Sequence, residues 1–446
     1  MKNFIKIASV FMLCIILVAC SKTNEKVEES KTNEKVEETK TNEKVEESKT
    51  NVEEANLSGT IEIWSSGEEL SRFVEGFNKI YPDIKVNITV VPNSEFIAKI
   101  TPTLASGQGA PDIFTGESDY VKYLVDSGYW DDLRQAPYNC ETYTNDMWDY
   151  IVSVGTDNND AIRALSWQAS PGSVIYRKDM ALEILGTDDP VELGKMLSSN
   201  EGMLDVAEKL NEKGIKMFAS WQDIWNMEFS NRENPWVVDS KLMLEESTLE
   251  FMDTAKEIAE NGYSLNVDPW APEWSAAVES DDTFCYVLPT WGYQFVVKPS
   301  ADKTVGNWGL CEGTIPYVKG GTWLGIYKDS KNKELAWKFM EYVTCNSEAQ
   351  QEYAKQYGEY VSLKSADEQL AKQEGEEVLG GQNLYEFYNA QMEKIPSDLM
   401  TPYDGQINTA FLSATKAYAT GLLDKEKAIQ QFKDDVVNAY PEIIVE

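Results

Sequence analysis

Residues 59–91 read GTIEIWSSGEELSRFVEGFNKIYPDIKVNITVV, and this stretch decides the fold class. Ile61 and Ile63 alternate with other residues as they do in a strand, and residues 84–91 alternate in the same way. Between these segments the apolar side chains recur at helical spacing, at Leu70, Phe73, Val74, Phe77 and Ile80. A strand, a helix and a second strand in this order indicate a parallel sheet with a crossover helix.

The same pattern continues along the chain. A second helix is predicted through Phe96, Ile97, Ile100 and Leu104, then a short strand at 110–116, then a helix through Val121, Leu124 and Val125. We therefore predict an α/β fold with doubly wound sheets. Ligands of such sheets lie beyond the carboxyl ends of the strands, which places the loops 64–69 and 115–117 at the candidate site.

The composition excludes several classes of function. The chain has 40 Lys and Arg against 75 Asp and Glu, a formal net charge of −35, so nucleic acid is not an expected partner. It has no histidine, which removes Ser-His-Asp and Cys-His catalysis and every His-ligated metal site. The DNND cluster at 157–160 lacks the glycine and the spacing of an EF-hand loop, and we predict a solvated turn there. No phosphate-binding GxxxxGK[ST] motif occurs, and we expect neither a cofactor nor a metal.

The first residues predict export from the cell. Residues 1–19 combine Lys2 and Lys6 with an apolar run too short to cross a bilayer comfortably, which is typical of a signal peptide. They end in LVAC at 17–20, a pattern that resembles the bacterial lipobox, so we predict that Cys20 carries a lipid anchor. The alternative is an ordinary signal peptide, with cleavage near Ala19 and an incidental cysteine.

A repeated phrase follows Cys20. The sequence [ST]KTNEKVEE occurs at 21–29, 30–38 and 39–47 and contains almost nothing apolar except valine. Such a segment cannot bury enough surface to fold, so residues 20–56 are predicted to be a disordered tether. A flexible chain of this length spans on the order of 30–35 Å.

The four cysteines of the body are Cys140, Cys285, Cys311 and Cys345, and they lie far apart without CxxC spacing. This excludes a zinc ribbon. One or two disulfides and free buried thiols both remain compatible with the sequence.

Four motifs in a fixed order resemble one family. They are APDIF (110–114), LSWQASPGSVIYRKDM (165–180), LPTWGYQF (288–295) and GGTWLGIYKDSKNKELAWKFMEYVTCNSEAQQEYAKQYG (320–358). Over residues 57–446 the chain resembles the extracellular solute-binding proteins of sugar-uptake ABC transporters, of the maltose-binding-protein type. Arg177 departs from the family pattern, which usually has Asn there.

The resemblance implies two α/β lobes joined by a hinge, with the chain crossing between them near Gly172, Pro316 and Thr344. One lobe would combine 57–172 with 317–345, and the other 173–316 with 346–446. The implied function is a monomeric, non-enzymatic receptor on the outer face of the cell membrane. Its two lobes would close over a carbohydrate and deliver it to the permease subunits of an ABC transporter. The family pattern also places Cys285 and Cys311 on neighbouring strands of one lobe, and a disulfide between them stays open.

A sugar site needs flat aromatic side chains for the C–H face of the ring, with carboxylates or amides for its hydroxyls. Our candidates are Trp64, Glu68, Glu69, Asp112, Glu117, Trp167, Gln168, Trp221, Trp291 and Trp323. We expect Trp291 and Trp323 to belong to different lobes and to approach when the cleft closes. Core packing is the alternative for each tryptophan, helix-dipole stabilisation for Glu68 and Glu69, and loop capping for Asp112. Weaker candidates lie in the divergent segment 225–275, namely Trp225, Trp236, Trp270 and Trp274.

Two functions of other classes remain open. Aromatic platforms beside paired carboxylates also occur in glycoside hydrolases, and a surface-anchored enzyme of that kind would need two carboxyl groups across the scissile bond. A glycan-binding adhesin would explain the anchor and the tether. The predicted two-lobe pattern favours the receptor.

Overall fold

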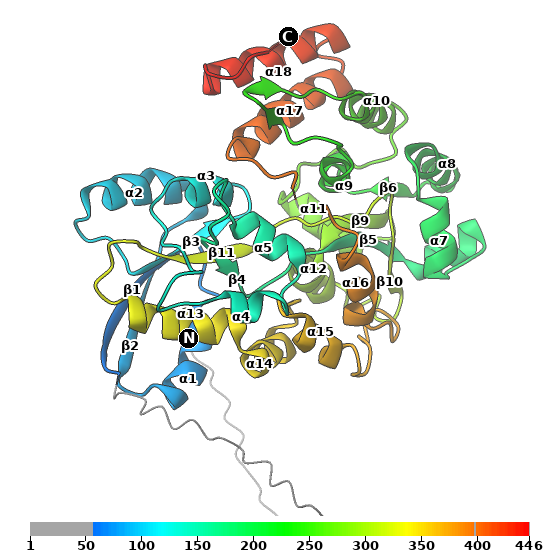
Figure 1. Ribbon diagram of the computed structural model, residues 1–446. Coiled ribbons are helices and arrows are strands. Elements are labelled where there is room, and N and C mark those ends of the chain that lie inside the picture. Colours follow the sequence, from blue (N-terminus) through cyan, green and yellow to red (C-terminus); the bar gives the residue numbers. More distant parts are fainter. Residues whose placement is uncertain (1–56, 397, 446) are drawn as a thin grey trace, which may run out of the picture. The chain divides into compact units, whose positions relative to one another are not determined.

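The computed structural model describes residues 57–396 and 398–445 (Figure 1). The predicted signal peptide at 1–19, the lipidated Cys20 and the tether at 20–56 lie outside the described residues. Within the part that is described, no helix combines the length and the apolar character needed to cross a bilayer.

The first lobe is built on a five-stranded sheet in the order β2-β1-β3-β11-β4. Its strands are β1 (Gly59–Ser65), β2 (Ile84–Val90), β3 (Ile113–Glu117), β4 (Leu165–Ser166) and β11 (Thr322–Ile326). β1 pairs in parallel with β2 and β3, whereas β11 runs antiparallel between β3 and β4. The predicted parallel unit is confirmed for the first three strands, and a strand from late in the chain makes the sheet mixed.

The helices of this lobe bury apolar side chains, except for the short helix Glu141–Thr144, which has no buried residue. They are α1 (Ser71–Ile80), α2 (Asn93–Ser106), α3 (Val121–Asp126), α4 (Glu141–Thr144), α5 (Asp149–Gly155) and α13 (Lys333–Cys345). Phe73 and Phe77 of α1 are buried, as the helical spacing predicts, and Ile61 and Ile63 of β1 are fully buried. Each such side chain contributes about 1.5–3 kcal/mol on burial, so the apolar periodicity of this segment stabilises the lobe.

The second lobe is built on a four-stranded sheet in the order β10-β5-β9-β6. Its strands are β5 (Gly172–Arg177), β6 (Lys216–Phe218), β9 (Thr283–Pro289) and β10 (Trp308–Cys311), and β7 (Val237–Val238) and β8 (Lys241–Leu242) form a separate two-stranded ribbon. β5 runs antiparallel to both of its neighbours, and β6 runs parallel to β9. Every residue of β9 is buried, as expected of a strand covered on both faces.

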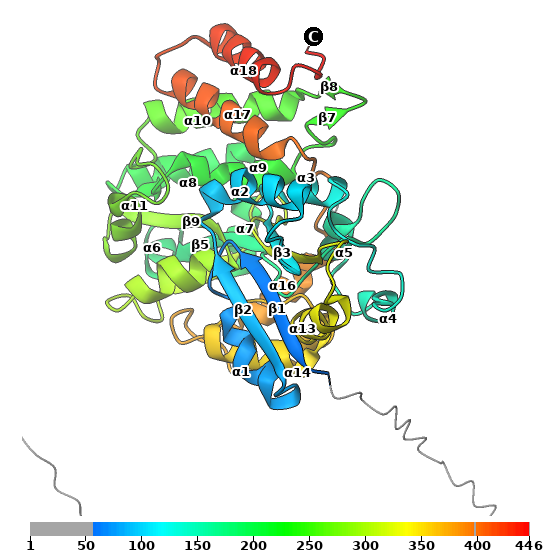
Figure 2. The same ribbon diagram turned by 90° about the vertical axis from the view of Figure 1, so that its left-hand side faces the viewer.

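The remaining helices come after β5 in the chain, either between the strands of the second sheet or after α13. They are α6 (Lys178–Met180), α7 (Pro190–Met196), α8 (Asn200–Asn211), α9 (Trp225–Ser230), α10 (Glu246–Glu260), α11 (Pro272–Ala276), α12 (Thr290–Gly292), α14 (Ser347–Tyr357), α15 (Lys364–Leu370), α16 (Leu384–Met392), α17 (Asp404–Ala419) and α18 (Lys425–Ala439). Short 3-10 or π segments are η1 (Ala181–Leu185), η2 (Trp221–Ile224), η3 (Ala277–Glu279), η4 (Tyr293–Val297) and η5 (Lys298–Ser300). α10, α17 and α18 lie side by side at one end of the body in both views (Figures 1 and 2).

The expected neighbouring placement of Cys285 and Cys311 is wrong. Cys285 lies in β9 and Cys311 in β10, and β5 runs between these two strands. The intervening strand keeps the thiols apart, and the four described cysteines are free. The disulfide that the sequence left open is therefore absent from the described chain.

The chain passes from the first sheet to the second between β4 and β5, and returns between β10 and β11. After α13 it does not leave the first lobe at once, because Tyr353 of α14 stacks on Phe73 of α1 with ring centroids 4.4 Å apart. The predicted lobe boundaries stay predictions, and this contact argues for a later return than Thr344.

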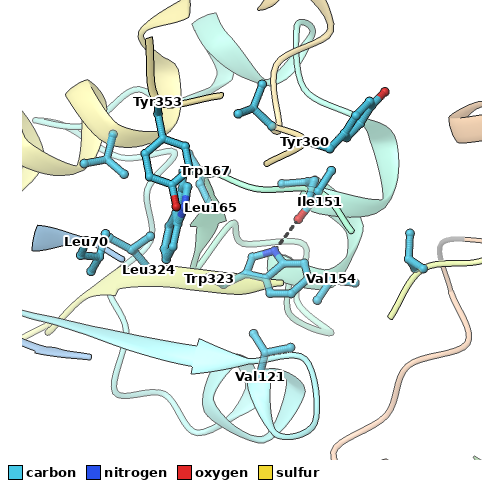
Figure 3. Packing of buried hydrophobic residues seen from close by; sticks show 14 of the residues in the cluster. Leu70, Val121, Ile151, Val154, Leu165, Trp167, Trp323, Leu324, Tyr353 and Tyr360 are labelled. Carbon is cyan, nitrogen blue, oxygen red and sulfur yellow. Dashed lines mark hydrogen bonds between the residues drawn. The ribbon is translucent and has the colours of Figure 1, made fainter. Parts of the chain in front are cut away.

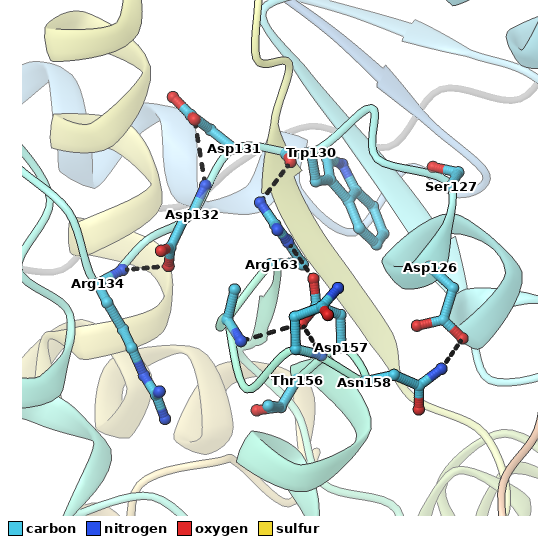
Figure 4. Close-up of polar contacts among 12 residues, drawn as sticks. Asp126, Ser127, Trp130, Asp131, Asp132, Arg134, Thr156, Asp157, Asn158 and Arg163 are labelled. Carbon is cyan, nitrogen blue, oxygen red and sulfur yellow. Dashed lines mark hydrogen bonds and ion pairs between the residues drawn. The ribbon is translucent and has the colours of Figure 1, made fainter.

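The DNND segment at 157–160 forms a turn, as predicted (Figure 4). The Asp157 carboxylate accepts hydrogen bonds from the backbone N–H groups of Asn159 and Ala161, at 2.8 and 3.0 Å. Its second oxygen accepts one from Arg163 Nε at 2.8 Å. The carboxylate is thus committed to holding this turn.

Candidate functional site

One cavity of about 670 Å³ is lined by side chains of both lobes. Ser66 follows β1 and Glu117 ends β3, so the cavity lies beyond the carboxyl ends of these parallel strands. Trp225, Trp270 and Trp291 of the second lobe line the same space. Two chemically different walls therefore enclose one site.

The first wall consists of hydrogen-bonded polar side chains, and we call Ser66, Glu117, Gln168, Thr322 and Glu359 the polar wall. Thr322 stands opposite Glu117 in the β3–β11 register, and its hydroxyl donates to Glu117 Oε1 at 2.8 Å. The Ser66 hydroxyl donates to the same oxygen. Gln168 Nε2 donates to Glu359 Oε2 at 2.9 Å, so the two ends of the wall are joined through neighbouring side chains.

Glu359 is held from behind the cavity. Its Oε1 accepts hydrogen bonds from Arg72 Nη1 at 3.0 Å and from the Tyr353 hydroxyl at 2.7 Å. Because Oε2 is bonded to Gln168, both carboxylate oxygens have protein partners. These partners fix the orientation of the Gln168 amide at the cavity surface.

Two carboxyl groups of the cavity have strongly altered acidity. Loss of solvation raises the pKa of Glu117 to about 7, against the opposing hydrogen bonds from Ser66 and Thr322. Burial likewise raises the pKa of Asp223 to about 7, although Trp274 Nε1 donates to its Oδ2 at 2.8 Å. Neither group forms an ion pair in the described part of the chain. Both are therefore poised to exchange a proton near neutral pH.

The second wall is aromatic, and we call Trp225, Trp270, Trp274, Trp291 and Phe295 the aromatic wall. Trp270 is 65% exposed and stacks on Trp291, with centroids 5.4 Å apart and planes 19° from parallel. Trp274 lies 5.3 Å from Trp270 on the same wall. Trp274 is fully buried, so Trp270, Trp291 and Phe295 supply the apolar surface that is open to a bound molecule.

The orientation of Trp291 depends on the glycines that precede β11. Its Nε1 donates to the Lys319 carbonyl at 2.9 Å. A Cβ on Gly320 would come within 2.7 Å of that nitrogen, and Gly320 has a φ of +98°, a conformation that favours glycine. The Gly320-Gly321 pair therefore allows the first-lobe strand to approach the aromatic wall.

The comparisons agree with this architecture. Residues 72–378 match the family described as bacterial extracellular solute-binding protein. The chain belongs to that family. Among curated proteins no match was found.

Several solved structures have the same fold, and the alignments span almost the whole length of those chains. An extracellular solute-binding protein of family 1 aligns with a TM-score of 0.76 at 19% identity, over 85% of this chain and 99% of the other. The galacto-N-biose/lacto-N-biose I-binding protein of an ABC transporter from Bifidobacterium longum gives 0.69 at 16%, over 86% and 97%. The sugar-binding protein MalE from Xanthomonas citri gives 0.69 at 16%, over 85% and 97%. The solute-binding protein thus has the two-lobed α/β fold that its sequence predicted.

Four of the predicted site residues line the cavity of this solute-binding protein, namely Glu69, Glu117, Gln168 and Trp291. Glu68 is exposed and does not line the cavity, although its neighbour Glu69 does. Trp64 is half-buried and packs against the first hydrophobic core instead. The loop after β1 therefore contributes Ser66, Gly67 and Glu69, but neither of these two residues, to the lining.

The expectation that Trp323 lies at the cleft surface is wrong (Figure 3). Its side chain is fully buried, and Nε1 donates to the Ile151 carbonyl at 2.9 Å. Trp323 stands opposite Gly116 and Ser166 in its two strand pairings, which leaves room for the large ring inside the lobe. The ring packs the core behind the polar wall.

Trp167 and Trp221 are also core residues. Trp167 packs edge-on against Phe73 with centroids 6.3 Å apart, and is 1% exposed. Trp221 begins η2 rather than ending β6, and packs against Phe251 at 6.2 Å. Neither tryptophan lines the cavity.

Asp112 has the loop-capping position that was its alternative. Its carboxylate accepts from the Glu62 backbone N–H at 2.9 Å and from the Ser330 hydroxyl at 2.6 Å. Asn332 Nδ2 donates to it as well, at 3.2 Å. The side chain is buried and joins β1 to the loop after β11, outside the cavity.

Several lining residues were missed or ranked low. Trp225, Trp270 and Trp274 were weaker candidates, and Asp223, Glu359 and Asp404 were not candidates. Asp223 follows β6 closely, so the rule that ligands lie beyond strand ends could have found it. Glu359 directly follows the last recognised motif, whereas Asp404 begins α17 and has no comparable signal in the sequence.

Proposed function

We propose that this solute-binding protein is a receptor for a sugar or a short oligosaccharide, which it binds in the described cavity. The observation that carries the proposal is the pairing of a polar wall and an aromatic wall around one space. Carboxylates and amides of the polar wall accept and donate hydrogen bonds to hydroxyls, while the tryptophan faces cover the C–H surface of a pyranose. A similar protein, from Bifidobacterium longum, was solved in complex with lacto-N-biose, and this supports the proposal.

The lobe division is part of the proposal. Residues 57–172 and 317–345 would move against 173–316 and 346–446, with the exact return point after Thr344 shifted by the contact of α14 with α1. Closure would bring the polar wall and the aromatic wall against opposite sides of the ligand. Glu69, Glu117, Gln168 and Trp291 are the predicted residues that we retain as ligand contacts, together with Trp270 and Asp223.

Delivery to the permease subunits of an ABC transporter is the proposed biological role. The sequence supports it through the LVAC motif ending at Cys20 and the tether at 20–56, which would keep a monomeric receptor at the outer face of the membrane. Cys20→Ser should release the full-length protein into the medium when expressed in a lipoprotein-processing bacterium. Membrane association equal to that of the unmodified chain would contradict the anchor.

A glycan panel tests the receptor against the hydrolase and adhesin alternatives. Each oligosaccharide is titrated calorimetrically and then incubated with the protein while new reducing ends are measured. Binding of a soluble oligosaccharide without cleavage is expected of a receptor. Release of reducing ends would establish the hydrolase, and binding only to surface-attached polysaccharide would favour the adhesin.

A further inference from the structure

The charge of the cavity is strongly one-sided. Six carboxyl side chains are among its described lining residues: Glu69, Glu117, Asp119, Asp223, Glu359 and Asp404. Lys319 is the single Lys or Arg among the same lining residues. A bound molecule therefore meets many acceptors of hydrogen bonds and one cationic side chain.

The Lys319 ammonium group already has an ion-pair partner within the protein. Lys319 Nζ lies 2.7 Å from Asp119 Oδ1 and pairs with it. Arg72, behind the polar wall, pairs with Glu359 at 3.0 Å. These two pairs compensate two of the six carboxyl groups and leave no uncommitted basic side chain among the described lining residues.

The other four carboxyl groups have no ion-pair partner within the described chain: Glu69, Glu117, Asp223 and Asp404. Asp223 and Asp404 are each 5% exposed, so water screens them poorly. Asp404 accepts hydrogen bonds from Thr401, and Asp223 accepts one from Trp274, but these donors are neutral. Arg232 and Lys319 partly offset the charge of Asp404, and Arg72 partly offsets that of Glu69, whereas no basic side chain of the described chain acts on Glu117 or Asp223. The negative charge of the site is therefore only partly balanced.

The aromatic wall also disfavours anionic groups of a ligand. The faces of Trp270 and Trp291 carry partial negative charge, which attracts cations and repels anions. A ligand carboxylate, sulfate or phosphate would lose its hydration here without gaining a basic partner. A hydroxyl or an ammonium group can donate to the unpaired carboxylates instead.

We propose that the cavity selects against negatively charged glycans and that its ligand is a neutral or amine-bearing oligosaccharide. The inference rests on the proposed sugar-receptor function and adds the charge class of the ligand. Uronic-acid, sulfated and phosphorylated sugars are the excluded substrates.

Near-isosteric pairs of glycans test the selection. The full-length protein is titrated with cellotetraose, maltotetraose and β-1,4-galactotetraose, and with the forms of each in which the C6 hydroxymethyl groups are oxidised to carboxylates. Changes in tryptophan fluorescence report binding, because Trp270 and Trp291 line the cavity. The assay is run at about pH 8 and low salt, where the carboxyl groups are ionised and weakly screened.

The neutral member of a pair should bind at least roughly tenfold more tightly than its oxidised form, since each unpaired carboxylate near the ligand adds repulsion. Equal or tighter binding of an oxidised form would overturn the charge selection while leaving the sugar receptor intact. Binding of none of the six glycans would count against the sugar receptor itself, and with it against the selection.

Two adjacent glutamates provide a matched pair of variants. Glu69 lines the cavity, whereas Glu68 is exposed outside it, and neither belongs to the core. Glu69→Gln should lower the ratio of the affinity for the neutral glycan to the affinity for its oxidised form by roughly threefold or more. Glu68→Gln should leave this ratio unchanged. An equal change in both variants would assign the selection to general surface charge and overturn the role of the cavity carboxylates.

Discussion

The two walls of the cavity are built in different ways. The polar wall stands on β3 and β11 and in the segments that follow β1, β4 and α14, and its side chains are connected from Ser66 through Glu117, Thr322 and Gln168 to Glu359. The aromatic wall stands on short helices and irregular segments of the second lobe, and its most exposed ring, Trp270, is held mainly by stacking. The side chains of the polar wall are hydrogen-bonded to one another, whereas the rings of the aromatic wall contact each other through their faces and Trp274 and Trp291 donate only to groups outside the wall.

This difference implies that the two walls contribute to ligand binding in different ways. A bonded network holds its donors and acceptors in place before the ligand arrives, which reduces the ordering cost of binding. Stacked rings supply apolar area and tolerate small shifts, because their attraction depends weakly on direction. We therefore expect changes behind or within the polar wall to affect stability, and changes in the aromatic wall to affect affinity.

The largest effect is expected immediately behind the polar wall. Trp323→Ala removes a fully buried ring together with its hydrogen bond to the Ile151 carbonyl, and should lower the free energy of unfolding by about 3–5 kcal/mol. Chemical denaturation of the ligand-free protein measures the change. Trp323→Phe is the control and should recover part of the loss. A Trp323→Ala protein as stable as the parent would show that the ring is not a core residue.

The fold of the first lobe was predictable because its signals are local. Ile61, Ile63, Phe73 and Phe77 repeat at strand and helix periods, and the structure buries all of them. The position of β11 was not predictable from periodicity, because its partners β3 and β4 lie far away in sequence. The resemblance to the family supplied the two-lobed arrangement instead.

The polar wall was more predictable than the aromatic wall for the same reason. Glu117 and Gln168 lie at or near the ends of strands, where a doubly wound sheet binds its ligands. Trp270 lies in an irregular segment with no strand or helix pattern, so nothing local shows that it is exposed. Trp323 misled us because a strand-end position alone does not tell which face of the sheet a ring occupies.

The next effect tests the bonded network of the polar wall. Glu359→Ala leaves Arg72, Tyr353 and Gln168 without their shared acceptor, and should cost about 2–3 kcal/mol of stability. It should also weaken glycan binding, because the Gln168 amide loses its orientation. Glu359→Gln, which keeps an acceptor oxygen, is the control and should lose less. If Glu359→Ala lost affinity with no loss of stability, the network would not be structural.

A smaller change in free energy is expected from the aromatic wall, and it should appear in binding alone. Trp270→Ala removes the most exposed ring and should weaken binding of the best glycan by about tenfold, or roughly 1.4 kcal/mol. The unfolding free energy should stay within about 0.5 kcal/mol of the parent. Leu422→Ala, at an exposed apolar residue outside the cavity, is the control. Unchanged affinity in Trp270→Ala would remove this ring from the site.

The smallest effect is a dependence of stability on pH that should come from Glu117 of the polar wall and from Asp223, which accepts a hydrogen bond from Trp274 of the aromatic wall. Burial raises the pKa of Glu117 and of Asp223 to about 7, so the folded protein holds their protons at a pH where the unfolded chain has released them. Stability from these groups is therefore complete below the ordinary carboxyl pKa and is lost as the pH rises through about 7. For each pH unit between about pH 5 and pH 7 the ligand-free protein should lose on the order of 1 kcal/mol per group. Asp223→Asn keeps an acceptor for Trp274 but cannot ionise, so it should reduce the pH dependence of the unfolding free energy, whereas Glu68→Gln should not.

A bound glycan that donates hydroxyls to these carboxylates stabilises their charged forms, so binding should release protons near pH 7. Calorimetry in buffers of different ionisation enthalpy measures that release. Proton uptake on binding would mean that the ligand meets the neutral carboxyl groups, and would reverse the direction of hydrogen bonding that we assign to the site.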